Sequence, residues 1–75
     1  MEWTKFVAKA IRHCMDHDFA ITKTKTYLTE YLNEFGIVHK WEKHSLWIDD
    51  VEFDIGFNSK NICRRFSIGY HNLLK

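Results

Sequence analysis

The chain of 75 residues has no proline, three glycines and two cysteines. The glycines, Gly36, Gly56 and Gly69, are too far apart to form a phosphate-binding loop or a dinucleotide-binding motif. A nucleophilic serine flanked by glycines is also missing. Because the chain has no proline, no repeat and no run of Gly or Ser, nothing marks an internal boundary, and we expect a single domain over residues 1–75.

The two cysteines lack the dense spacing of a secreted disulfide scaffold. Cys14 falls in a predicted helix and Cys63 in a predicted strand, so we expect two free thiols in a reducing, cytoplasmic compartment. A cysteine–histidine nucleophile at Cys14 is the alternative, but its place on the apolar side of the helix favours a small core residue. So short a chain has little room for an enclosed substrate pocket, and we expect no enzymatic activity, no catalytic residue and no cofactor.

Long hydrophobic runs are absent from the chain. None approaches the roughly 20 apolar residues of a membrane span, and Met1–Arg12 carries charges where a signal peptide has an apolar run. We therefore expect no membrane association and no export by that route.

A charge excess of either sign is missing too. The formal net charge is +1, with five basic and five acidic residues through Gly36 and six and five after it. A dedicated duplex-DNA binder usually has a strong basic excess, because neutralising phosphates supplies much of its affinity. The balance lowers the expectation of DNA binding without removing it.

Two segments repeat apolar residues at the three-and-four spacing of a helix face. In the first, which we expect to end near Asp16, these are Trp3, Phe6, Val7, Ala10, Ile11 and Cys14. In the second they are Leu28, Tyr31, Leu32 and Phe35, and Gly36 follows at the position of a helix C′ residue. A Thr hydroxyl can accept an unpaired N–H at a helix start, so Thr22 or Thr24 is the expected N-cap of the second helix.

After Gly36 the period changes to two, the period of a strand. The first alternating run consists of Val51, Phe53, Ile55 and Phe57, with polar residues or glycine between them. The second run consists of Ile62, Arg64, Phe66, Ile68 and Tyr70, which alternate with the residues between them. Asn58–Asn61 supplies a turn between the two runs. Ile37–Glu42 and Leu46–Ile48 are shorter candidates, joined near His44. The prediction is an α+β domain in which two N-terminal helices pack on a three- to four-stranded antiparallel sheet, ααβββ or ααββββ.

His13 and His17 are four residues apart in the first helix, so their imidazoles could converge on one metal ion. A structural zinc site normally has two recognisable pairs of ligands, and the second pair is missing here. We favour a solvated helix end, whose histidines stabilise the negative pole, and expect no metal.

Four carboxylates fall within six residues: Asp49, Asp50, Glu52 and Asp54. In a strand, Glu52 and Asp54 lie on the same outward face. The first interpretation is a solvated face whose charges prevent edge-to-edge pairing of sheets. The second is an acidic surface that docks a basic partner, and the third, a metal-dependent nuclease site, lacks a lysine after the acids.

Trp41 and Trp47 flank a predicted turn, and we expect them to share one face with Lys43, His44 and His39. Trp is enriched at binding hot spots, and a small domain has little core in which to bury three tryptophans. The competing interpretation is an aromatic cover over the sheet.

A basic set offers a different function. Lys23 and Lys25 lie at the start of the second helix, where they could meet phosphates, and Arg64 and Arg65 add charge from the last strand. The order helix, short connection, helix and β-hairpin resembles a winged helix-turn-helix over about half the chain, although the usual third helix is missing and there are more strands than a simple wing needs.

From these features we expect a non-enzymatic protein-interaction module, a regulator or inhibitor of the small accessory kind that phages encode. It would dock another protein through Trp41, Trp47, Asp49, Asp50, Glu52 and Asp54. The alternative is a nucleic-acid-binding protein with a helix-turn-helix-like N-terminal half that uses Lys23, Lys25, Arg64 and Arg65. Homodimerisation through a strand edge or an aromatic patch is compatible with either.

Overall fold

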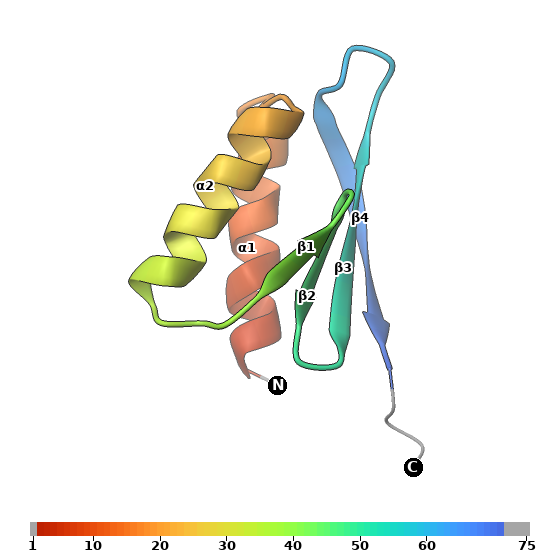
Figure 1. The fold of residues 1–75 in the computed structure, drawn as a ribbon. Coiled ribbons are helices and arrows are strands. Elements are labelled where there is room, and N and C mark those ends of the chain that lie inside the picture. Colours follow the sequence, from red (N-terminus) through yellow and green to blue (C-terminus); the bar gives the residue numbers. More distant parts are fainter. Residues whose placement is uncertain (1, 72–75) are drawn as a thin grey trace.

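The computed structural model describes residues 2–71, and in this part of the chain two helices precede four strands (Figure 1). The helices are α1 (Glu2–Asp16) and α2 (Ile21–Glu34). The strands are β1 (Lys40–Glu42), β2 (Ser45–Ile48), β3 (Val51–Phe57) and β4 (Cys63–Tyr70). The strands pair antiparallel in the order β1-β2-β3-β4, which confirms the α+β prediction in its ααββββ form.

The two helices run side by side in opposite directions and cover one face of the sheet (Figure 1). Aromatic contacts fix this arrangement. Phe6 near the start of α1 contacts Tyr31 near the end of α2, and His13 near the end of α1 stacks on Tyr27. A helix-turn-helix unit instead has helices that cross steeply, at about 90–120°. The antiparallel, side-by-side arrangement of α1 and α2 differs from that steep crossing, and the helix-turn-helix-like alternative stays a prediction.

Both helices end in the same way. The second residue after each helix end takes a left-handed backbone conformation, Asp18 with φ 54° and Gly36 with φ 68°. In each case two backbone N–H groups then return to the last turn, as in a Schellman motif. This confirms the predicted end of the first helix near Asp16 and the C′ position of Gly36.

The start of α2 differs from the prediction. Its N-cap is Ala20, and neither Thr22 nor Thr24 caps it. The preceding loop is held against β4, because the Cys63 N–H donates to the Phe19 carbonyl at 2.9 Å and Ala20 bridges Ile62. The helix therefore begins earlier, and the fully buried Thr24 turns its hydroxyl to the Phe19 carbonyl at 3.4 Å.

The core lies between the helices and the sheet. It is made of buried residues from both helices and from β2, β3 and β4: Val7, Ala10, Ile11, Cys14, Leu28, Leu32, Leu46, Ile48, Val51, Phe53, Ile55 and Cys63. Along β3 the buried residues alternate with Glu52 and Asp54, as the period of two predicts. Neither helix of residues 2–71 combines the length and the apolar character needed to cross a membrane.

The alternation expected in the last strand is broken by a bulge. Cys63 pairs with Phe57 and Arg65 with Gly56, so β4 contains one extra residue at this point. The extra residue shifts the alternation of side chains along β4. Cys63, Phe66 and Ile68 face the helices. The sequence alternation predicted that Arg64 would share the face of Phe66 and Ile68, and this prediction is wrong. The predicted turn at Asn58–Asn61 is confirmed, and the Asn58 side chain accepts the N–H groups of Lys60 and Ile62 at 2.9 Å.

Candidate functional site

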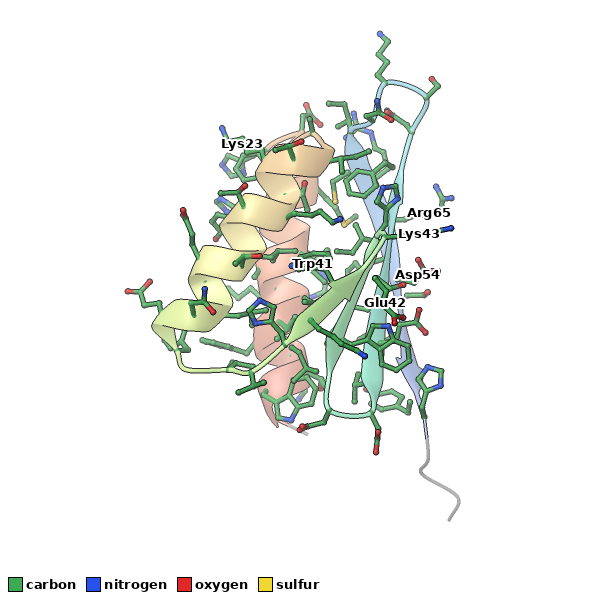
Figure 2. All side chains as sticks on the ribbon, in the orientation of Figure 1. Lys23, Trp41, Glu42, Lys43, Asp54 and Arg65 are labelled. Atoms are coloured by element: carbon green, nitrogen blue, oxygen red, sulfur yellow. The ribbon has the colours of Figure 1, made fainter. Side chains whose placement is uncertain are left out.

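The sheet face opposite the helices is not covered by any described element (Figure 1). Its residues follow from the strand register and form rows across the sheet. The first row is Lys40, Trp47, Glu52 and Gly69; the second is Glu42, Ser45, Asp54 and Ser67; and the third is Gly56 and Arg65. We call these residues, with His71 beyond the end of β4, the open face. Figure 2 shows Glu42, Asp54 and Arg65 on the side of the sheet away from α1 and α2.

Glu52 lies at the centre of a hydrogen-bonded group on the open face. The Ser45 hydroxyl donates to its Oε2 at 2.6 Å, and His71 Nε2 lies 3.1 Å from its Oε1. These two contacts, that of Ser45 first, hold the pKa of the Glu52 carboxyl below its ordinary value. The order Ser–Glu–His is not that of a catalytic triad, in which the imidazole stands between the hydroxyl and the carboxylate. The two contacts hold the Glu52 carboxylate between Ser45 and His71.

Trp47 is the large aromatic residue of the open face. The His71 ring packs against its indole, with ring centroids 4.7 Å apart. The Trp47 Nε1–H is shielded from water and has no hydrogen-bond partner among the described residues. A cleft of about 200 Å³ borders the same indole and is lined by Val38, His39, Lys40 and Asp49. The side chain of Val38 at this cleft is 88% exposed.

Trp41 does not join Trp47, which corrects the expectation of a shared face. Lys40 pairs with Trp47, so Trp41, the next residue of β1, lies on the opposite face. Its Nε1–H donates to the Thr29 hydroxyl of α2 at 3.0 Å, and the Lys25 ammonium lies 5.2 Å from its ring centroid. In Figure 2, Trp41 points between the sheet and α2. Trp41 attaches β1 to the helical layer.

The predicted acidic residues divide between the open face and one end of it. Glu52 and Asp54 lie in the middle of the open face, on β3. Asp49 and Asp50 form the exposed turn between β2 and β3, where Asp49 borders the Trp47 cleft and the Asp50 carbonyl accepts the His71 N–H at 2.8 Å. The structure thus brings together Trp47, all four carboxylates and Glu42, a sixth residue that sequence reasoning missed.

Ser45 and His71 were missed as well. Neither residue carries a signal of its own, because one serine and one C-terminal histidine fit any surface. Only the strand register reveals their positions. Ser45 pairs with Asp54, which brings its hydroxyl within reach of Glu52, and His71 lies at the end of the same face. The lengths of the turns between the strands determine this register, so they are the information needed to predict both residues.

The four predicted nucleic-acid-binding residues do not form one surface. The Lys23 ammonium lies 4.5 Å from the ring centroid of Phe19, on the helical layer. Arg64 forms an ion pair with Asp18 at 2.6 Å. Arg65 lies on the open face, over Gly56, whose missing side chain leaves room for it. Figure 2 shows Lys23 and Arg65 on opposite sides of the molecule.

The histidine and cysteine candidates lie within the helical layer and the core. The rings of His13 and His17 stack with centroids 4.1 Å apart, and within residues 2–71 no group of three His, Cys, Asp or Glu side chains could hold a metal ion. Cys14 and Cys63 are free and buried, as expected of core residues. Burial, and then the neighbouring Cys63, raises the pKa of the Cys14 thiol to about 12, which keeps the thiol protonated and unreactive.

Comparisons of the chain with protein-family models, with curated proteins and with solved structures find no match.

Proposed function

We propose that this chain is a protein-interaction module that binds a partner protein with its open face and in this way regulates or inhibits that partner, without catalysing a reaction. The observation that carries the proposal is Trp47. Its large aromatic surface lies on an uncovered sheet face beside an open cleft, where a side chain of a partner can enter.

The unpaired indole N–H of Trp47 supports the proposal. A shielded donor without an acceptor costs about 1–3 kcal/mol, and native proteins rarely keep one without a reason. A partner can supply an oxygen acceptor at Nε1 only if binding displaces the groups that shield it, such as the His71 ring that packs against the indole. The free protein would then carry a strained group that binding relieves.

Charge gives the partner its chemistry. Glu42, Glu52 and Asp54 occupy adjacent rows of the open face, and Asp49 and Asp50 extend the carboxylates to its end. Lys40 and Arg65 stand on the two edge strands. A partner surface with an apolar anchor and basic groups complements this pattern, and complementary charges fix orientation and speed association.

The test compares proteins captured from an extract of the cells in which the protein occurs, treated with nuclease. The variant Glu42→Lys/Asp54→Lys reverses two open-face charges at side chains that are exposed. The matched control, Glu30→Lys/Glu34→Lys, makes the same charge change at exposed positions of α2. We expect wild type and control to retain the same protein at moderate salt, and the open-face variant to retain about tenfold less, because juxtaposed like charges cost more than the 1.4 kcal/mol that this factor represents.

Circular dichroism verifies that both variants fold. If a folded open-face variant captures the same protein in the same amount as wild type, the proposal is wrong. If the α2 control loses the protein instead, the partner binds the helical layer.

A further inference from the structure

The two edges of the sheet differ in length and protection. β1, at one edge, has three residues, and its Trp41 is tied to α2. β4, at the other edge, has eight residues. The Phe19 carbonyl and Ala20 cover only its beginning, at Cys63 and Ile62. Beyond the bulge, the segment Phe66–Tyr70 is a regular strand with no proline, the kind of edge on which another strand can pair.

The direction of the free backbone groups follows from one hydrogen bond. The His71 N–H donates to the Asp50 carbonyl and so points toward β3. Because this direction alternates along an antiparallel strand, Gly69 and Ser67 also turn toward β3. Phe66, Ile68 and Tyr70 turn their N–H and C=O groups to the open edge. None of these six groups has a hydrogen-bond partner within residues 2–71.

A groove runs along this edge under α1. It has a volume of about 600 Å³ and is lined by Thr4, Lys5, Ala8 and Arg12 of α1 and by Ile68 and Tyr70 of β4. Its apolar floor is incompletely covered, since Tyr70 is 48% exposed and Ile68 is half-buried. An added strand would place every second side chain on this floor.

The rim of the groove is basic. Lys5, Lys9 and Arg12 are exposed on α1, and none of them forms an ion pair with a described carboxylate. The Arg12 guanidinium lies 5.6 Å from the ring centroid of Phe66, directly beside the free edge. Arg65 adds a cation at the start of the same segment, on the open-face side.

We propose that the free edge of β4 binds an extended acidic segment of a partner protein, which pairs with Phe66–Tyr70 as a fifth strand and places carboxylates near Lys5 and Arg12. Main-chain hydrogen bonds would supply affinity, and the basic rim would select the sign of charge. This site goes beyond the proposed function, since it shares no required residue with the open-face contact of Trp47.

A second copy of the chain fits this edge less well. Phe66–Tyr70 contains no acidic residue, and two copies paired through β4 would bring together the basic side chains Lys5, Lys9 and Arg12 of both α1 helices. Like charges that face one another across an interface are unfavourable. The chemistry of the rim therefore points to an acidic occupant.

The test uses a short peptide that alternates Glu and Val, with a peptide that alternates Lys and Val as its control, and measures amide hydrogen exchange by NMR in the intact protein. We expect the Glu peptide to slow exchange of the Phe66, Ile68 and Tyr70 amides by about tenfold or more, because each gains a hydrogen bond. The amides of Ser67 and Gly69 should change little, since they already face β3.

Two charge variants complete the design. Lys5→Glu should weaken binding of the Glu peptide by about tenfold, whereas Lys60→Glu, the same change in the exposed turn before β4, should not. Equal binding of both peptides, or slowed exchange elsewhere, would overturn the proposal. If exchange of these amides becomes slower as the protein concentration rises in the absence of peptide, the edge binds a second copy instead. A DNA oligonucleotide that binds through Lys5 while the Glu peptide does not would assign the rim to nucleic acid.

Discussion

Trp41 and Trp47 belong to one β-hairpin and lie on opposite faces of it. On the covered face, Trp41 has every contact that a structural aromatic needs: its N–H is paired with Thr29 and its ring lies against α2. On the open face, Trp47 has an N–H with no partner within residues 2–71, the His71 ring against its indole and a cleft beside it. The same residue type thus serves cohesion on one face and is available for contact on the other. Which role it has is decided by the side of the sheet it occupies, and three experiments test this contrast.

The largest effect is expected from Phe53, the fully buried aromatic of β3 on the covered face. Phe53→Ala should lower the free energy of unfolding by about 3–5 kcal/mol, since it removes a large side chain and leaves a cavity. Asp54→Ala, one residue along the strand on the open face, should change it by less than about 0.5 kcal/mol. Equilibrium denaturation in urea measures both, and Phe53→Leu provides a milder variant if Phe53→Ala is unfolded. Similar losses at both positions would contradict the contrast between faces.

A smaller change in the free energy of unfolding is expected for the two tryptophans, and it should differ between them. Trp41→Phe removes the donor to Thr29 and weakens the contact with Lys25, which should cost about 1 kcal/mol beyond the lost area. Trp47→Phe removes an N–H that has no partner, so it should cost less than Trp41→Phe or stabilise the protein. The same denaturation experiment decides. A greater loss for Trp47→Phe would show that its N–H is satisfied in solution.

The smallest effect concerns acid stability. The contacts of Glu52, with Ser45 first and then His71, lower its pKa below the ordinary value of 4.5. The folded state therefore prefers the ionised carboxylate, and this stabilisation is complete above pH 4.5 and is lost as the pH falls through the lowered pKa. We expect Glu52→Gln and Ser45→Ala to reduce the loss of stability on acidification, measured as the change in thermal midpoint with pH. An unchanged pH dependence in both variants would rule out this role.

Much of the architecture was predictable because local patterns decide it. The three-and-four spacing of apolar residues predicts both helices, Gly36 ends the second, and the alternation of Val51–Phe57 predicts the central strand with Glu52 and Asp54 facing outward. These signals depend only on neighbours in the chain.

The relation between strands could not be predicted in the same way. Trp41 and Trp47 have the same parity in the sequence, and one continuous strand would place them on the same face. The two-residue turn Lys43–His44 changes the phase, because it pairs Trp47 with Lys40 rather than with Trp41. The position of a tight turn, uncertain by one residue from sequence, therefore decides which tryptophan lies on the open face.

Long-range contacts account for the other differences. Thr22 and Thr24 have the chemistry of an N-cap, but Phe19 and Ala20 are held by β4, so the helix begins at Ile21. The bulge at Arg64 shifts the phase of β4 in the same region. The contacts of Phe19 with Cys63 and of Ala20 with Ile62 are not visible in a local sequence pattern, because the partners lie more than forty residues apart.

The strand order β1-β2-β3-β4 also has a consequence for how the chain folds. Every strand pairs with its neighbour in the sequence, and the two helices form a hairpin of their own, so most contacts close short loops. Low contact order of this kind predicts fast folding, because little loop entropy is lost before native contacts form. The hydrogen bond from Cys63 to Phe19 joins the two local units. Their docking is therefore the step that we expect to limit the rate, and substitutions at that junction should slow folding more than substitutions within either hairpin.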